Sequence, residues 1–287
     1  MKKRQISLII LILIITIGIG TFMVTRNKHD TIEMKTSEVI KSKQLLKVKR
    51  SILHIKDQHG TLHGTLFTSN QAQKNKPLII YSHELGNNQS TGWKYARSLA
   101  KQGYTAYTYT FNHGSAGSDM TKMSIFTEED DLNAVVNHFK KQGYKKIFLL
   151  GASQGGVVSA MTAADRKDIK GLVLFYPAFV LRDDMLKRFP NNKFPKTFDM
   201  WGMTLGREYL ARLPKYNIEK EVIRYHGPVL LVHGTSDSTA PISYSERMAK
   251  TYKNARLVKI PGAGHGFYGL EAQKATKELL SFIKKNQ

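Results

Sequence analysis

The sequence contains no cysteine and few acidic residues. Without cysteine the chain can form no disulfide and can carry no lipid anchor on a cysteine. Asp and Glu number 22 against 44 Lys and Arg, which gives a formal net charge of +22. The positive charges are scattered and no nucleic-acid recognition motif accompanies them, so we expect no nucleic-acid partner. Scattered lysine suits a protein that faces anionic lipid or wall polymer.

Charge is also missing from one long stretch near the N-terminus. Residues 6–24 carry none, are rich in Ile and Leu, and follow three basic residues at positions 2–4. A stretch of that length just spans a bilayer. A cleaved signal peptide would have a shorter apolar core, and the three leading basic residues argue against a buried helix of the folded domain. We expect a cytoplasmic tail at 1–5, a transmembrane signal-anchor at 6–25, a basic stalk at 26–46 and a single folded domain at 47–287. This places the protein in the cell membrane with its domain outside the cytoplasm, although basic residues on both flanks leave the orientation open.

Residues 145–156 have the pattern of a strand that runs into a tight turn and a helix. The apolar run 147–150 leads into Gly151-Ala-Ser153-Gln-Gly155, and mostly apolar and small residues follow over 157–164. This arrangement is typical of a nucleophile elbow, a turn so sharp that the neighbours of the serine must be nearly free of side chains. The sequence therefore predicts Ser153 as a catalytic nucleophile at the carboxyl edge of a parallel sheet.

A serine nucleophile needs a base, and the base needs a residue that orients it. Asp237 lies in a loop after the apolar strand 228–234, and His265 lies among small residues after the strand 256–260. The chain order Ser, Asp, His is that of α/β-hydrolases. Taken singly, the aspartate and the histidine could be ordinary loop residues. Their positions after successive strands predict a triad of Ser153, Asp237 and His265.

An oxyanion hole requires two N–H donors. We expect one from the backbone of Gln154 and the other from Leu85, in the loop after the strand 78–82. In α/β-hydrolases this loop begins His-Gly, whereas here Glu84 follows His83. No second ligand pair at helical spacing accompanies these two residues, which argues against a metal site. We expect His83 to brace the loop through hydrogen bonds to the backbone.

Short apolar segments alternate with helical patterns after an N-terminal hairpin. Apolar strands separated by helices indicate a parallel sheet that is covered on both faces. The expected strands are 48–56, 61–68, 78–82, 105–111, 147–150, 171–176, 228–234 and 256–260, and the expected helices are 92–102, 128–141 and 157–164. The fold class is therefore α/β, an α/β-hydrolase fold with a mostly parallel, doubly wound sheet.

The alternation breaks at residues 178–227, which we call the lid segment. About fifty residues stand where a short connection would suffice, which indicates a functional insertion after the strand that follows the nucleophile helix. The segment is rich in aromatic residues. These can shape an apolar acyl or aryl pocket and exclude water, or they can pack the segment onto the main domain.

Three segments resemble bacterial cinnamoyl (feruloyl) esterases of the α/β-hydrolase superfamily. They are GASQGGVVSAM at 151–161, YPAFVLRDD at 176–184 and LGREYL at 205–210, within a resemblance that covers about residues 50–285. The resemblance implies the same triad and oxyanion donors. It also implies that Asp184 and Tyr209 contact the hydroxyl of a phenolic ring. A glutamine-containing part of the lid in those esterases has no counterpart here, and a membrane anchor is not typical of them.

Together these features predict a serine carboxylic-ester hydrolase that forms an acyl-enzyme. Its expected substrates are hydroxycinnamate or other small acyl esters, and the N-terminal segment adds the lipid bilayer as a partner. The chemistry requires neither a metal nor an organic cofactor. The oligomeric state is open, with a homodimer as one option.

Three other functions remain open. A serine aminopeptidase on the same fold would need acidic residues to bind a substrate amine, and Glu84, Asp183 and Asp184 are candidates. A lysophospholipase or monoacylglycerol lipase would suit the anchor and the apolar lid segment. A non-catalytic binding module that keeps the hydrolase shell would usually have lost a triad residue, and none is missing here.

Overall fold

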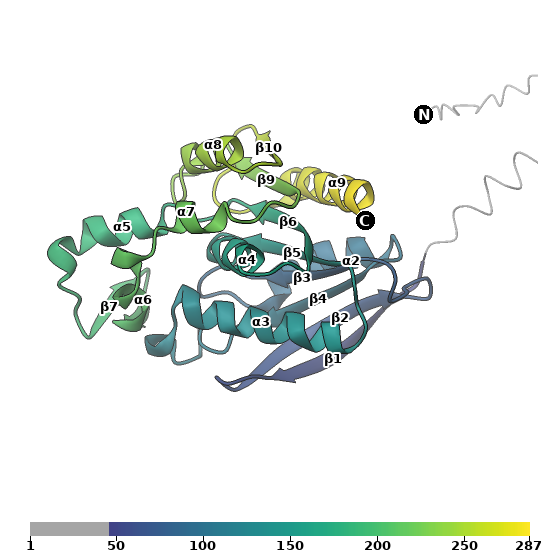
Figure 1. Ribbon diagram of the computed structural model, residues 1–287, viewed down its shortest axis with the longest axis horizontal. Helices are drawn as coiled ribbons and strands as arrows, with labels where there is room; N and C mark the ends of the chain where they lie inside the picture. Colours follow the sequence, from purple (N-terminus) through teal and green to yellow (C-terminus); the bar gives the residue numbers. More distant parts are fainter. Residues whose placement is uncertain (1–45) are drawn as a thin grey trace, which may run out of the picture. The chain divides into compact units, whose positions relative to one another are not determined.

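The computed structural model describes residues 46–287 (Figure 1). The predicted cytoplasmic tail and signal-anchor, and nearly all of the predicted stalk, lie outside the described residues. The membrane location therefore stays a prediction. Within residues 46–287, no helix combines the length and the apolar character needed to cross a membrane.

An eight-stranded sheet forms the centre of the domain, in the order β1-β2-β4-β3-β5-β6-β9-β10. Its strands are β1 (Val48–Lys56), β2 (Thr61–Ser69), β3 (Leu78–Ser82), β4 (Thr105–Thr110), β5 (Ile147–Ala152), β6 (Ile169–Phe175), β9 (Val229–Gly234) and β10 (Ala255–Ile260). β2 pairs antiparallel with both β1 and β4, and all other neighbours are parallel. The loops after β5, β9 and β10 therefore meet at one edge of the sheet, where α/β proteins bind their ligands. The predicted mostly parallel, doubly wound fold is confirmed.

Helices cover both faces of the sheet. α2 (Trp93–Ala100) and α9 (Gly269–Asn286) pack on one face, and α3 (Ile125–Lys141), α4 (Gln154–Ala164) and α8 (Ile242–Thr251) pack on the other. Figure 1 shows α3 and α4 in front of the sheet. Ile147 and Leu149 of β5 belong to one core, and Phe148 and Leu150 belong to the other. Burial on both faces explains why this strand is an unbroken apolar run.

The helix α3 begins at Ile125 rather than at the expected residue 128. Ser124 forms a capping box with Thr127, in which each side chain accepts a hydrogen bond from the other residue's backbone N–H. Such a box satisfies two N–H groups that a helix start leaves free. Because the helix starts earlier, its first turns carry Glu128 into the core. The helices α8 and α9 have no counterpart among the expected elements.

The lid segment leaves the sheet after β6 and returns at β9, the neighbouring strand. It contains α5 (Leu181–Arg188), β7 (Thr197–Met200), β8 (Met203–Gly206), α6 (Glu208–Ala211) and α7 (Ile218–Val222). It also contains two short 3₁₀ turns, Pro190–Asn192 and Leu213–Lys215. Two further 3₁₀ turns, Gln89–Gly92 and Met120–Lys122, lie outside the lid segment. Phe179, Phe198 and Tyr209 are buried, whereas Trp201 between β7 and β8 is 72% exposed. An insertion at the predicted place is thus present, and several of its aromatic side chains pack it onto the domain.

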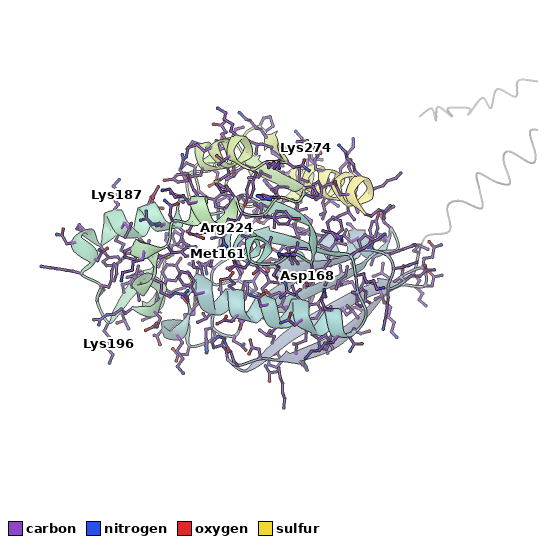
Figure 2. The ribbon with its side chains drawn as sticks, viewed as in Figure 1. Met161, Asp168, Lys187, Lys196, Arg224 and Lys274 are labelled. Carbon is purple, nitrogen blue, oxygen red and sulfur yellow. The ribbon has the colours of Figure 1, made fainter. Side chains whose placement is uncertain are left out.

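Lysine side chains extend from separate parts of the described surface. Figure 2 shows Lys187 on α5, Lys196 before β7 and Lys274 on α9 at different edges of the view, and all three are exposed. Met161, by contrast, is buried on α4. These lysines lie apart from one another, as expected for scattered positive charge.

Candidate active site

Ser153 occupies a strained turn between β5 and α4. Its backbone has φ 51° and ψ −119°, a conformation that costs of order 1–3 kcal/mol for a residue with a Cβ. A Cβ at Gly151 would overlap the carbonyl oxygen of Gly155. A Cβ at Gly155 would overlap the carbonyl oxygens of Ser82 and His83. The two glycines of the Gly-x-Ser-x-Gly motif are therefore required by direct contact with backbone.

The side chains of Ser153, His265 and Asp237 form a continuous chain of hydrogen bonds. Ser153 Oγ lies 2.8 Å from His265 Nε2, and His265 Nδ1 lies 2.8 Å from Asp237 Oδ2. Because an ionised carboxylate only accepts hydrogen bonds, Nδ1 carries the proton and Nε2 accepts from the serine hydroxyl. The structure thus brings together all three residues predicted for the triad.

Asp237 is surrounded by hydrogen-bond donors. The N–H groups of Thr239 and Ala240 donate to Oδ1 at 2.9 and 2.8 Å, and His233 Nε2 lies 3.1 Å from Oδ2. Burial works to raise the pKa of Asp237, but the hydrogen bonds from His233, His265 and Ala240 outweigh it. They hold this pKa well below its usual range. The carboxylate therefore stays ionised and can orient His265.

The predicted site did not include His233, which is fully buried at the end of β9. Its Nε2 faces two acceptors, Asp237 Oδ2 and, at 2.8 Å, the carbonyl oxygen of Ala240. Nε2 therefore carries the proton, and Nδ1 accepts a 2.7 Å hydrogen bond from Ser245 Oγ. A histidine in an otherwise apolar strand, shortly before the predicted triad aspartate, is the sequence signal that could have revealed it.

The backbone N–H groups of Leu85 and Gln154 make no hydrogen bond within the described chain. Gln154 is the first residue of α4, where free N–H groups favour an anion. Leu85 precedes Gly86, which donates to the carbonyl oxygen of Gly114 at 2.9 Å and accepts from the N–H of Ala116 at 3.0 Å. Leu85 and Gln154 both line the cavity that contains Ser153. The two residues predicted as oxyanion donors thus have N–H groups without a partner among the described residues and line the same cavity as Ser153.

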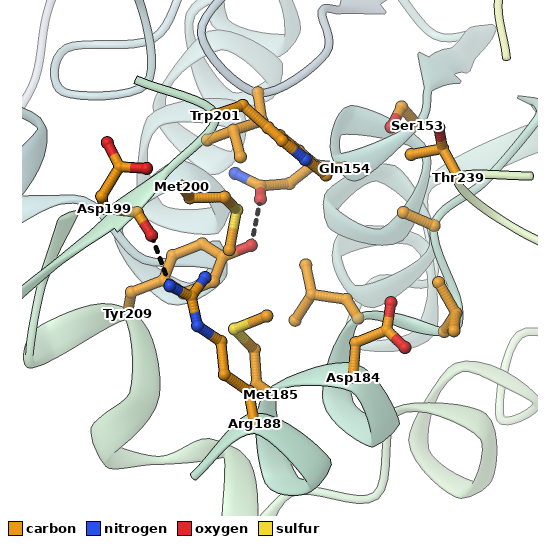
Figure 3. A pocket seen from close by; sticks show the side chains of 14 residues that line it. Ser153, Gln154, Asp184, Met185, Arg188, Asp199, Met200, Trp201, Tyr209 and Thr239 are labelled. Carbon is orange, nitrogen blue, oxygen red and sulfur yellow. Dashed lines mark hydrogen bonds between the residues drawn. The ribbon is translucent and has the colours of Figure 1, made fainter. Parts of the chain in front are cut away.

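The side chain of Gln154 links the lid segment to the core. The Tyr209 hydroxyl on α6 donates to Gln154 Oε1 at 2.8 Å, one of the dashed lines in Figure 3. Gln154 Nε2 donates to Glu128 Oε2 at 2.8 Å. Burial raises the pKa of Glu128 to about 8, against a lowering effect of the Gln154 hydrogen bond. Sequence reasoning missed Glu128, although an acidic residue in line with Ile125 and Leu132 on an apolar helix face was a visible signal.

A cavity of about 340 Å³ opens beside Ser153, within the usual range of ligand pockets. It is lined by Leu85, Ser153, Gln154, Ala178, Val180, Leu181, Asp184, Met185, Arg188, Asp199, Met200, Trp201, Tyr209 and Thr239. Figure 3 shows Ser153 and Thr239 on one side of the view and Asp199 on the other. Most of the lining comes from the lid segment and is apolar, so the lid segment supplies the walls of a site for a small ligand.

The two residues assigned to substrate by resemblance, Asp184 and Tyr209, both line this cavity. Asp184 lies on α5, and its side chain is largely exposed but partly shielded by its neighbours. Partial burial and the neighbouring Asp183 raise its pKa. Tyr209 is buried, and its hydroxyl proton is already donated to Gln154. Tyr209 can therefore offer a ligand only an acceptor while that hydrogen bond persists.

Arg188, a cavity residue that the sequence did not single out, lies one helical turn after Asp184. One of its terminal nitrogens donates to the carbonyl oxygen of Asp199 at 2.7 Å, and its guanidinium packs over the rings of Phe189 and Phe198 at 5.4 Å. Within residues 46–287 it has no carboxylate partner within ion-pairing distance. The guanidinium thus retains N–H donors on the wall of the cavity.

His83 braces the oxyanion loop, as expected. The N–H of Phe111 donates to His83 Nε2 at 3.1 Å, so Nδ1 carries the proton and donates to the carbonyl oxygen of Glu84 at 2.7 Å. Burial lowers the pKa of His83 to about 4, which keeps the ring neutral. The Glu84 carboxylate accepts hydrogen bonds from the hydroxyls of Tyr176 at 2.7 Å and Thr91 at 3.0 Å. Within the described residues, no group of three or more His, Asp or Glu side chains could hold a metal ion.

Residues 122–287, more than half of the chain, match the prolyl oligopeptidase family, Peptidase_S9. The chain belongs to this family. The matched part contains the elbow, the lid segment and all three members of the Ser153–His265–Asp237 chain. The hydrogen-bond chain of Ser153, His265 and Asp237 thus lies within the residues that match the family.

This prolyl oligopeptidase family member is also similar to individual known proteins. Est1E from Butyrivibrio proteoclasticus, solved with bound ferulic acid, has a TM-score of 0.76 and 25% identity over 82% of this chain and 98% of that one. The AB hydrolase superfamily protein YisY of Bacillus subtilis is 22% identical over 266 residues, 77% of this chain and 96% of YisY. A 58-residue stretch is 40% identical to the bifunctional esterase/perhydrolase DCH of Acinetobacter calcoaceticus and spans 21% of that protein. The chain is thus an α/β-hydrolase with esterase-like relatives, which supports a hydrolytic activity.

Proposed function

We propose that this protein is a serine carboxylic-ester hydrolase that works through an acyl-enzyme. The observation that carries the proposal is the continuous chain from Ser153 through His265 to Asp237, which ends in a cavity beside the serine hydroxyl. Serine activated by a histidine, with the histidine oriented by a buried carboxylate, is the arrangement that makes a hydroxyl nucleophilic near neutral pH.

The reaction follows from these contacts. Ser153 Oγ attacks the ester carbonyl carbon while His265 Nε2 takes the hydroxyl proton. The negative oxygen of the tetrahedral intermediate accepts hydrogen bonds from the free N–H groups of Leu85 and Gln154. His265 then gives its proton to the leaving alkoxide as the carbon–oxygen bond of the ester breaks. Water repeats the attack on the acyl-enzyme, releases the acid and restores Ser153.

Hydroxycinnamate esters are the first substrates that we propose. The cavity has apolar walls for an aromatic acyl group, and Asp184 places a carboxylate on its lining that can accept a hydrogen bond from a phenolic hydroxyl. The similarity to Est1E with bound ferulic acid supports the same substrate class. The volume of about 340 Å³ lies toward the low end for ligand pockets, which favours a small acyl group over a long one.

Two measurements on the full chain test this proposal. A fluorophosphonate should label the wild type and fail to label Ser153→Ala, and the same substitution should lower kcat by a factor of about 10⁴ or more. The acyl preference should appear in kcat/KM for methyl ferulate against short and long p-nitrophenyl esters. A preference for long acyl chains would instead support a lipase. An unlabelled wild type that hydrolyses no ester would contradict the proposal and favour a binding module.

A serine aminopeptidase is the second candidate, because the family is named for a peptidase. It needs a carboxylate that is free to bind a substrate amine. The Glu84 carboxylate is already held by the hydroxyls of Tyr176 and Thr91, and Asp183 accepts from the Tyr244 hydroxyl at 2.8 Å. Of the three candidates only Asp184 lines the cavity. Cleavage of aminoacyl p-nitroanilides with a free amine, but not of the blocked forms, would favour this function over the esterase.

A further inference from the structure

A buried carboxyl group lies behind the two oxyanion donors. Glu128 on α3 is 1% exposed, and no lysine or arginine of residues 46–287 shifts its pKa. We propose that the neutral Glu128 carboxyl is a positioning residue that holds both donor segments in place. The inference rests on the function proposed above, because an oxyanion hole matters only if Ser153 is a nucleophile.

The first contact of Glu128 fixes the residue after the nucleophile. Gln154 Nε2 donates to Glu128 Oε2 at 2.8 Å and lies 3.4 Å from Met123 Sδ, while Gln154 Oε1 accepts from the Tyr209 hydroxyl. Both ends of this amide are therefore held, and the side chain is only 2% exposed. A fixed side chain restricts the backbone of Gln154, whose free N–H is one of the two oxyanion donors.

The second contact reaches the other donor. A Cβ at Gly114 would overlap Glu128 Oε1, so this oxygen lies directly against the Gly114 backbone. The carbonyl oxygen of Gly114 accepts the hydrogen bond from the N–H of Gly86, the residue after Leu85. The carboxyl group is thus packed between the start of α4 and the loop that holds the Leu85 N–H. Glu128 thus contacts Gln154 directly and reaches the Leu85 segment through Gly114 and Gly86.

The geometry also indicates which form of the carboxyl is present. Oε2 accepts from Gln154, and Oε1 is buried with no hydrogen-bond partner among the described residues. A neutral acid with its proton on Oε1 leaves one O–H donor unpaired there, which costs less than the uncompensated charge that the ionised form would bury. The titratable groups that face Glu128 from other elements are Tyr109 of β4 and Tyr209 of α6, and burial raises the pKa of both, so neither is a cation or an anion at neutral pH.

Ionisation of Glu128 therefore acts against catalysis. It places a negative charge next to the Gln154 side chain, close to a site that must stabilise a negative oxygen, and no cation among the described residues compensates that charge. The oxyanion exists in the transition state but not in the bound substrate, so the loss falls on kcat and leaves KM nearly unchanged. Burial raises the pKa of Glu128 to about 8. Since the neutral acid is the working form, the contribution of Glu128 to kcat is fully present below that value and is lost as the pH rises through it.

Steady-state kinetics of the full chain between about pH 6 and pH 10 test the inference, with an ester that the wild type hydrolyses. We expect the wild-type kcat to fall about fivefold or more above about pH 8, with KM constant to about twofold. Glu128→Gln keeps the shape and the acceptor for Gln154 but cannot ionise. It should retain about a third or more of the neutral kcat and lose the alkaline decline.

Glu129→Gln is the matched control. It makes the same chemical change at the adjacent residue of α3, where burial also raises the pKa, to about 7. Among the described residues, Glu129 makes no hydrogen bond to Gln154 and is not among the nearest neighbours of a Cβ at Gly114. This variant should keep both the wild-type kcat and its alkaline decline. The inference is overturned if Glu128→Gln declines as the wild type does, or if Glu129→Gln abolishes the decline.

Gly114→Ala gives an independent test through the second contact. Its methyl group presses on Glu128 Oε1, so we expect kcat to fall about tenfold or more at neutral pH with little change in KM. A folded variant with the wild-type kcat would overturn the role of this contact. Fluorophosphonate labelling separates the two proposals. A wild type that is labelled but shows no alkaline decline overturns the role of Glu128 alone, whereas an unlabelled wild type overturns the proposed function and this inference with it.

Discussion

His233 Nε2 lies 3.1 Å from Oδ2 of Asp237, the same oxygen that accepts from His265 at 2.8 Å. One carboxylate oxygen is thus shared between a histidine buried at the end of β9 and the histidine that is hydrogen-bonded to Ser153. The orientation of His265 depends on the position of this oxygen, and His233 helps to fix it.

We expect His233→Phe to lower the free energy of unfolding by about 2–3 kcal/mol, because Asp237 Oδ2 loses a donor and the Ser245 hydroxyl loses its acceptor. The kcat should fall about tenfold with KM unchanged, since the aspartate is held less well. Urea unfolding and steady-state kinetics measure the two effects. Ser245→Ala is the control. It leaves the donor to Asp237 intact and should lower stability by about 1 kcal/mol while kcat changes less than about twofold. Equal losses of kcat in the two variants would contradict this role.

The depressed pKa of Asp237 predicts how its contribution to stability depends on pH. Its folded pKa lies below the unfolded value of about 3.8. The ionised group therefore stabilises the fold at every pH above that value, and the contribution is lost as the pH falls toward the folded pKa. Asp237→Asn should lower the unfolding free energy by about 1–3 kcal/mol at neutral pH, and the difference from the wild type should shrink below about pH 4. A difference that is constant between pH 7 and pH 3, measured by chemical unfolding, would contradict the assignment.

Gly155 is predicted to tolerate no side chain. The methyl group of Gly155→Ala would overlap the backbone oxygens of Ser82 and His83, so α4 must shift away from β3. We expect a loss of about 2–3 kcal/mol in unfolding free energy and a fall in kcat of about 100-fold or more. Gly264→Ala is the comparison, because no described residue other than its two chain neighbours lies within 4 Å of a Cβ there. Its stability should change by less than about 0.5 kcal/mol, and a similar loss in both variants would refute the explanation.

Arg188 and Asp184 should have opposite effects on the choice of acyl group. Arg188 offers unpaired N–H donors to the cavity, and Asp184 offers an acceptor one helical turn away. We compare kcat/KM for the monomethyl ester of a dicarboxylic acid with that for an alkanoate methyl ester of equal length. Arg188→Gln should lower this ratio about tenfold, and Asp184→Asn should raise it, since removal of like charge favours an anionic acyl group. A shift in the same direction for both variants would show that charge at this wall does not govern the preference.

The hydrogen-bond chain of Ser153, His265 and Asp237 could be predicted from the sequence because its constraints are local. The Gly-x-Ser-x-Gly turn needs two glycines at fixed positions, and Asp237 and His265 each follow directly after a strand of the parallel sheet. The order of these strands then fixes where the three side chains meet. Short, unbroken apolar strands that alternate with helical segments leave little choice of fold.

The parts that were missed depend on contacts between distant segments. Glu128 and His233 are polar residues within apolar patterns, and nothing local shows that Gln154 or Asp237 will pair with them. The elements of the lid segment are even harder to predict from the sequence, because β7 and β8 are each four residues long and are held by tertiary packing. Gly206 of β8, for example, lies directly against the carbonyl oxygen of Thr121. Local propensity is too weak to predict such short elements.

The lid segment begins and ends at two strands that are hydrogen-bonded to each other, with Leu172 of β6 opposite Val229 of β9. Insertions and deletions between these strands can therefore occur without any change in the register of the sheet that carries Ser153, Asp237 and His265. Evolution can therefore replace most of the cavity lining as one continuous segment. The positions of Ser153, Asp237 and His265 need not change when it does. Families built in this way should diverge quickly in what they hydrolyse and slowly in how they hydrolyse it.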